Sequence, residues 1–136
     1  MRFNLVDRVH AWEPGKRLTA SKVLTLGEEY LADHFPTFPV MPGVLMLQAV
    51  VEAAAWLWRA TTDYRHPVIV LRDVRNVKYG TFMQPGRRMD VGVELSKTDG
   101  DTATFCFAQP DKERPTKFET KEGSGLTLST WKKVKK

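Results

Sequence analysis

The sequence predicts an α+β fold in which an antiparallel sheet wraps round one central helix. The helix is indicated by a run from Gly43 to Trp58 that is apolar on nearly every side, which is typical of a buried helix. The sheet is indicated by short segments, mostly after that run, that alternate between apolar and polar residues and are separated by turn signals. The 136 residues are 42% apolar and 27% charged, so we expect a single domain spanning residues 1–136.

The segment before the helix, residues 33–42, is expected to be a rigid loop with His34 at its head. Each proline of this loop fixes its own φ and disfavours the helical region for the residue before it. The prolines are Pro36, Pro39 and Pro42.

The central helix carries two polar side chains before Arg59, namely Gln48 and Glu52. Their spacing of four residues places them on one face, about 5–6 Å apart. Buried polar groups need partners or a function, so this pair is a candidate site. The run is too short and too interrupted to be a good membrane span.

The chain before the loop is expected to contain one strand. Residues 1–17 hold a short apolar patch that ends at the turn signal Pro14-Gly15. Leu18 to Leu26 alternates loosely and predicts the strand, and Glu28 to Ala32 predicts a brief helical turn.

The chain after the helix is expected to supply the remaining strands. Met89 to Ser96 alternates most strictly, and the turn signal Asp99-Gly100-Asp101 predicts a hairpin to the next strand. Pro85-Gly86 marks another turn, and Pro110 to Pro115 is expected to be a loop. The expected strands are Val68 to Tyr79, with a possible bulge, then Met89 to Ser96, Thr102 to Ala108, Lys117 to Lys121 and Leu126 to Trp131.

The chain has a net charge of +5, part of which belongs to a C-terminal tail (about 131–136) that we expect to be flexible. The other basic residues form either a solvated sheet face or a docking surface for an acidic partner. Nucleic acid is a poor fit, because no recognised binding motif or stacking platform accompanies the charge. The residues concerned are Arg72, Arg75, Lys78, Arg87 and Arg88.

The single cysteine, Cys106, excludes an internal disulfide and suits a reducing compartment, so we expect a cytoplasmic protein. We expect no secretory leader and no membrane span. The histidines His10, His34 and His66 do not follow metal-ligand spacing, and no nucleotide-binding glycine loop is present, so neither a metal nor a cofactor is expected.

Two stretches, His34 to Pro36 and Pro39 to Leu45, resemble the FabA/FabZ-type 3-hydroxyacyl-[acyl-carrier-protein] dehydratases, whose FabZ branch has an HFPGxPxMPGVL signature. The similarity covers roughly Phe3 to Leu95. This resemblance implies a hot-dog fold, a double hot-dog dimer with active sites between the subunits, and in some members a hexamer built as a trimer of dimers. Flanking segments also match, namely Leu5 to Val9, Glu13 to Arg17 and Met83 to Gly86.

The resemblance also implies a reaction, the loss of water from a 3-hydroxyacyl thioester carried on an acyl carrier protein. His34 would act on the C2 proton, and the backbone N–H of Gly43 would hold the thioester oxygen at a helix N-terminus. Phe35 and Val44, their neighbours in the motif, would contact substrate. The proton for the departing hydroxyl would come from a carboxylate at position 48, on the partner's helix.

The chain departs from the family at that position, because residue 48 is Gln48, and an amide cannot supply a proton. One turn later, where the family usually has glutamine, the chain has Glu52. Thr37 and Asp33 also replace glycines of the loop.

Three hypotheses follow. The first is a dehydratase or hydratase in which Glu52 supplies the proton, since an apolar site raises the pKa of a carboxyl group. The second is a thioesterase in which Glu52 is the base for water and Gln48 orients it. The third is a non-catalytic acyl-binding accessory protein.

Overall fold

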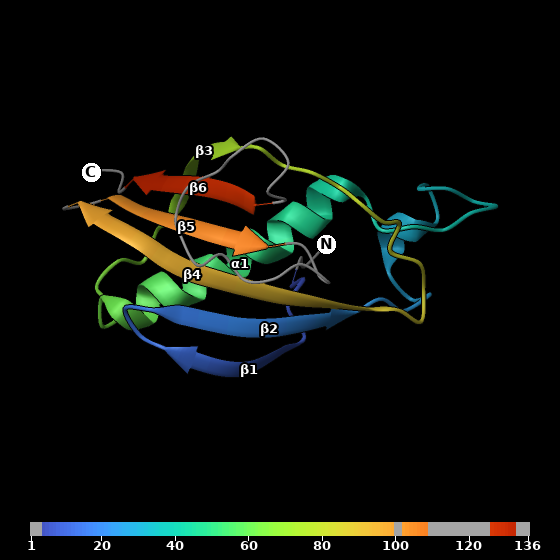
Figure 1. Cartoon of the computed structure of the whole chain (residues 1–136). Helices are drawn as coiled ribbons and strands as arrows, with labels where there is room; N and C mark the ends of the chain where they lie inside the picture. The colour runs from blue at the N-terminus through green and yellow to red at the C-terminus, as the bar shows by residue number, and fades with distance from the viewer. Residues whose placement is uncertain (1–3, 100–101, 109–125, 133–136) are drawn as a thin grey trace.

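The structure, a computed structural model, describes residues 4–99, 102–108 and 126–132. In these ranges one long helix lies across one face of a six-stranded antiparallel sheet with the order β1-β2-β4-β5-β6-β3 (Figure 1). This arrangement confirms the predicted α+β architecture. The elements are β1 (Arg8–Glu13), β2 (Arg17–Val23), the 3-10 helix η1 (Glu29–Leu31), α1 (Gly43–Thr61), β3 (Val70–Arg75), β4 (Arg88–Asp99), β5 (Thr102–Ala108) and β6 (Leu126–Lys132).

The core lies between α1 and the concave side of the sheet. Three of the buried residues of α1 are alanines, which allow the helix backbone to approach the strands closely. Every second residue at the start of β4 points inward, as the strict alternation predicted. The buried residues of the two layers include Ala49, Ala53, Ala54, Leu57 and Trp58 on α1, and Leu18, Ala20, Met89, Val91, Val93 and Phe105 on the sheet.

Most predicted elements are confirmed. The helix begins at Gly43 as expected, β5 has the predicted bounds, and the bounds of β2, β4 and β6 lie within three residues of the expected ones. The turn at Pro85-Gly86 is present, with Gly86 at a φ of 83° that favours glycine. No helix in the described part of the chain is long and apolar enough to cross a bilayer.

Two strand predictions are corrected by the structure. β1 was not expected, because the alternation of its residues is short and ends at Ala11-Trp12, and in the structure these residues are exposed or half-buried. It forms as an edge strand by backbone pairing with β2. The long strand predicted from Val68 to Tyr79 is shorter, since β3 ends at Arg75 and the next residue, Asn76, has a left-handed φ of 57°.

The possible bulge is confirmed, because the register against β6 shifts between Leu71 and Asp73. Four predicted features lie outside the described residues, namely the loop Pro110 to Pro115, the strand Lys117 to Lys121, the turn residues Gly100 and Asp101, and residues 133–136 of the expected tail. The first two residues of that tail, Trp131 and Lys132, belong to β6.

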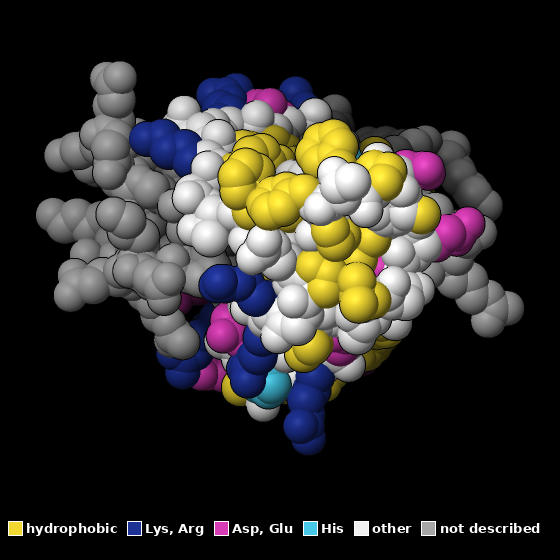
Figure 2. Space-filling view, turned by 90° about the vertical axis from the view of Figure 1, so that its right-hand side faces the viewer, with side chains coloured by type: hydrophobic (Ala, Val, Ile, Leu, Met, Phe, Trp, Pro, Cys, Tyr) yellow, Lys and Arg dark blue, Asp and Glu magenta, His cyan; other side chains and the backbone are white. Residues whose placement is uncertain are grey.

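The sheet covers only one side of α1. On the other side Val44 is 70% exposed, Trp56 is 45% exposed, and Gln48 between them is also exposed. Figure 2, which looks at the end of the molecule that carries the loop before α1, shows hydrophobic side chains gathered on the surface. Several large apolar residues before α1, at its start and in the segment after β3 are exposed. They are Leu26, Phe35, Phe38, Val44, Tyr79 and Phe82.

Candidate active site

The loop that carries His34 extends beyond the end of the sheet, as the cyan segment in Figure 1 shows. It is closed by backbone hydrogen bonds between Phe35 and Phe38, of 3.0 and 3.3 Å, and by a bond from the Val40 N–H to the His34 carbonyl of 3.0 Å. These bonds order the loop in addition to its prolines. The His34–Phe35 peptide bond is cis.

The imidazole of His34 is half-buried and has a defined orientation. Its Nδ1 lies 3.0 Å from the carbonyl oxygen of Val40. A carbonyl only accepts hydrogen bonds, so Nδ1 carries the ring proton and, in the neutral ring, Nε2 has the available lone pair. The ring also stacks on Phe35, with the centroids 4.2 Å apart. This arrangement suits a general base.

Gly43 lies at the N-terminus of α1. The helix ladder starts with the Leu45 and Met46 N–H groups, which donate to the Pro42 carbonyl at 2.9 and 3.1 Å. The N–H groups of Gly43 and Val44 precede this ladder and lie at the positive end of the helix dipole. They are donors of the kind that stabilise an oxyanion.

The Tyr79 ring lies directly against Gly43. A Cβ atom at position 43 would be 3.1 Å from two atoms of that ring, so a larger residue at this position would require the ring to shift by a few tenths of an ångström. The sequence analysis missed Tyr79, because it had placed this residue at the end of a strand. No local pattern could have identified a contact between positions 36 residues apart.

A pocket of about 210 Å³ lies next to the Tyr79 ring, which forms part of its lining. Its apolar lining includes Met46 from the first turns of α1, and three basic residues also line it, namely Lys78, Arg87 and Arg88. The other two members of the basic group, Arg72 and Arg75, lie on β3, which is the edge strand beyond β5 and β6. The five basic residues therefore belong to two regions of the structure.

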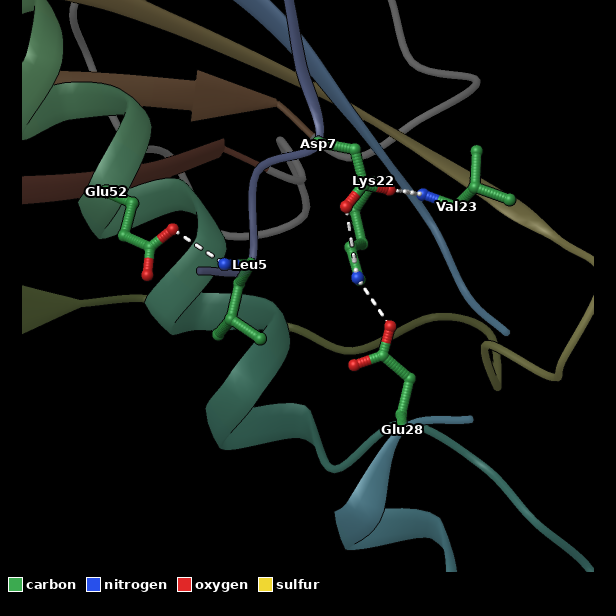
Figure 3. A network of polar contacts seen from close by, with 6 residues as sticks. All are labelled: Leu5, Asp7, Lys22, Val23, Glu28 and Glu52. Carbon is green, nitrogen blue, oxygen red and sulfur yellow. Dashed lines mark hydrogen bonds and ion pairs between the residues drawn. The ribbon is translucent and has the colours of Figure 1, made fainter. Parts of the chain in front are cut away.

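Glu52 and Gln48 share a face of α1 but have different surroundings. Gln48 is exposed, whereas Glu52 is half-buried and its Oε2 accepts a hydrogen bond of 2.9 Å from the Leu5 N–H (Figure 3). Burial raises the pKa of Glu52, and the N–H groups of Leu5 and Val6 and the charge of Lys22 oppose this shift. The raised pKa suits a proton donor, while the hydrogen bond gives Glu52 a structural contact.

The structure brings some of the predicted residues together and separates others. Gly43, Val44, Gln48 and Glu52 follow one another along α1. His34 makes no hydrogen bond to Gln48 or Glu52 in this chain. Its loop extends past the sheet (Figure 1), whereas Glu52 lies in the middle of α1.

Comparisons with known proteins give a family and a fold. The family model of the FabA-like domain matches residues 1–113. The 3-hydroxyacyl-[acyl-carrier-protein] dehydratase FabZ of Anaeromyxobacter sp. (strain Fw109-5) is 40% identical in an alignment of 102 residues that covers 72% of this chain and 65% of that protein. The FabZ dehydratase of Wolbachia pipientis wMel is 37% identical over 113 residues, 82% of this chain and 79% of that protein.

Among solved structures, thioesterase superfamily member 2 from Mus musculus superposes with a TM-score of 0.60 at 13% identity, covering 93% of this chain and 80% of that one. At this identity the similarity shows the fold alone.

The chain spans only part of the length of the curated relatives named first. The matched part is 65% of the Anaeromyxobacter protein and 60% of another FabZ dehydratase.

Proposed function

This chain belongs to the family of FabA-like domains and has the hot-dog fold, and we propose that it is a dehydratase. Its substrates would be 3-hydroxyacyl thioesters on an acyl carrier protein, in fatty-acid or related lipid biosynthesis, and the reverse reaction would hydrate 2-enoyl thioesters. The observation that carries this proposal is the orientation of His34, whose Nδ1 is bonded to the Val40 carbonyl and whose Nε2 can therefore accept a proton.

In the proposed reaction Nε2 of His34 removes the proton from C2 of the substrate. The electrons of the C2–H bond first move toward the thioester carbonyl, so that negative charge grows on the thioester oxygen, and they form the C2–C3 double bond when the C3–O bond breaks. The Gly43 N–H, at the start of α1, is the donor that would stabilise this charge. The C3–O bond then breaks, and the hydroxyl needs one proton to leave as water.

We propose Glu52 as the donor of that proton. Two observations support it. The family position, residue 48, carries an amide, and burial raises the pKa of Glu52 so that a proton is more often present. Because one carboxyl oxygen accepts the Leu5 N–H, a protonated Glu52 would donate from its other oxygen. Gln48, one turn nearer the N-terminus, would hydrogen-bond the hydroxyl.

We also propose that the working unit is a homodimer. Val44 and Trp56 expose apolar surface on the side of α1 that the sheet leaves uncovered, and exposed apolar patches mark interaction sites. The separation of His34 from Glu52 within one chain supports a site that a second copy completes. Sedimentation should therefore give a dimer or a larger assembly at micromolar concentration, and a folded monomer would argue against this proposal.

Two coupled measurements test the activity. A 2-enoyl or 3-hydroxyacyl thioester is added, and enoyl absorbance and free thiol are followed in parallel, with His34→Ala as the control. Dehydration predicts a change in enoyl absorbance without thiol release, and loss of that change in His34→Ala. Thiol release would indicate a thioesterase, and silence in both channels would indicate an acyl-binding protein without activity.

The proposed carrier partner is acidic, and Lys78, Arg87 and Arg88 line the pocket together with Tyr79, whose ring lies against the proposed oxyanion donor Gly43. The single cysteine fits a reaction in the cytoplasm.

A further inference from the structure

A buried lysine lies in a network that the proposed chemistry does not use. Lys22, on β2, is 4% exposed and points into the protein. Its Nζ binds the carboxylate of Glu28 at 2.6 Å and that of Asp7 at 3.1 Å (Figure 3). A buried ammonium is unfavourable unless it is paired, and here two carboxylates from different segments supply the pairing.

The two acidic residues, Asp7 and Glu28, make different further contacts. Asp7 stays on the β2 side of the network, because its other oxygen accepts the Val23 N–H at 2.6 Å. Glu28 instead lies immediately before η1, and its carbonyl accepts the Leu31 N–H of that helix at 3.0 Å. The ion pair Lys22–Glu28 therefore holds the N-terminus of η1 against β2 of the sheet.

From η1 a short path of backbone hydrogen bonds leads to the candidate base. The Tyr30 carbonyl accepts the His34 N–H at 3.2 Å, and the His34 carbonyl accepts the Val40 N–H at 3.0 Å. The Val40 carbonyl in turn contacts Nδ1 of His34 at 3.0 Å. The loop extends beyond the sheet, so its orientation depends on how its base is held (Figure 1).

We propose that Glu28, held by the buried Lys22, is a positioning residue for His34. Lys22 fixes Glu28, Glu28 fixes η1, and η1 fixes the backbone that orients the imidazole. This inference rests on the proposed function only for its kinetic consequence. Its structural consequence, an ordered loop at His34, holds for any activity.

The matched variants are Glu28→Ala and Asp7→Asn. Each removes one carboxylate from the same lysine and leaves the other, but only Glu28→Ala cuts the connection to η1. Asparagine at position 7 keeps an oxygen for the Val23 N–H. We expect Glu28→Ala to lower kcat at least about tenfold with KM within about twofold, since misplacing a catalytic group by about 1 Å can cost about 10²-fold. We expect Asp7→Asn to keep kcat within about threefold.

A conservative variant and a second readout separate positioning from loss of fold. Glu28→Gln keeps an oxygen that accepts a hydrogen bond from Lys22, so it should restore part of the kcat lost in Glu28→Ala. Hydrogen exchange of the His34 and Val40 amides should be faster in Glu28→Ala than in Asp7→Asn, while the thermal midpoints of the two variants stay close.

The outcomes are distinct. Equal kcat and equal exchange in the Glu28→Ala and Asp7→Asn variants would overturn the positioning role. If the wild-type protein turns over no thioester, the proposed function fails, and hydrogen exchange alone decides whether Glu28 orders the loop.

Discussion

The carboxylate of Glu52 accepts a hydrogen bond of 2.9 Å from the backbone N–H of Leu5, a residue 47 positions earlier in the chain. The side chain that we propose as the proton donor therefore also fastens the start of the chain to the middle of α1. A carboxylate and an amide of the same shape can both accept this bond, but only the carboxyl group can donate a proton to substrate. Glu52→Gln thus separates the two roles, and it should abolish dehydration while leaving the fold intact.

The same variant should change how stability depends on pH. The pKa of Glu52 is raised by burial from 4.5, so the folded state binds this proton more tightly than the unfolded chain does. The contribution of Glu52 is therefore most favourable below about pH 4.5, and it decreases as pH rises through the raised pKa. We expect Glu52→Gln to gain unfolding free energy relative to wild type as pH rises from 4 to 8.

Urea unfolding at several pH values measures this difference. A constant difference between Glu52→Gln and wild type across this range would contradict the raised pKa. If the Glu52→Gln variant dehydrates substrate at the wild-type rate, the proton comes from water or from His34 and not from Glu52.

Gln48→Glu should raise turnover, because it restores a carboxyl group at the family's position. The side chain of Gln48 is exposed on α1, so the fold should tolerate the change. General acid–base catalysis contributes about 10²–10⁴-fold, and steady-state kinetics on a 3-hydroxyacyl thioester measures the gain. Gln48→Leu is the control, because leucine has no proton to donate. An increase in turnover of less than about threefold in Gln48→Glu would mean that position 48 does not limit the rate.

Gly43→Ala should impair the site through Tyr79. The added Cβ would lie 3.1 Å from the Tyr79 ring, so the ring or the start of the helix must shift. We expect a loss of kcat of about tenfold or more with little loss of stability, because Tyr79 is half-exposed and can move. The double variant Gly43→Ala/Tyr79→Ala removes the clash and should recover activity, and a double variant as impaired as Gly43→Ala would exclude this contact as the cause.

Tyr30→Phe should be neutral or stabilising. The Tyr30 hydroxyl is buried and has no hydrogen-bond partner among the described residues. The pKa of Tyr30 is raised to about 12, mainly by burial and to a smaller extent by the negative charges of Glu28 and Asp7, so the phenol stays neutral. Removing a buried, unpaired hydroxyl avoids its desolvation cost, which is about 1–3 kcal/mol. Chemical denaturation measures the change, and a loss above about 1 kcal/mol would reveal a partner for this hydroxyl.

Charge reversal should distinguish the two groups of basic residues. Arg87→Glu/Arg88→Glu alters the pocket, whereas Arg72→Glu/Arg75→Glu alters the edge strand β3 by the same total charge. If an acidic carrier docks near the pocket, only the first pair should weaken binding strongly. The wild-type affinity should also fall as salt rises, since exposed charges are screened over about 8–10 Å. Equal effects of the two pairs, or binding insensitive to salt, would contradict this docking region.

Local patterns determined the elements of this protein and the identity of its motif. The apolar run predicted α1, the strict alternation of β4 predicted its inward face, and the prolines around His34 predicted an ordered loop. These predictions succeeded because each depends on residues that are close in sequence. β1 was not predicted, because its exposed residues alternate only briefly and its strand conformation depends on backbone pairing with β2.

The tertiary structure alone decided how the candidate residues are held. The spacing of Gln48 and Glu52 placed both on one face of a helix, but only the fold exposes the first and joins the second to Leu5. The contact of Tyr79 with Gly43 and the path from Lys22 through Glu28 to His34 connect segments that no periodicity relates. The partner of Glu52 lies 47 positions away and is brought to it by the way the chain packs against α1, and this burial and hydrogen bonding set the direction of the Glu52 pKa shift.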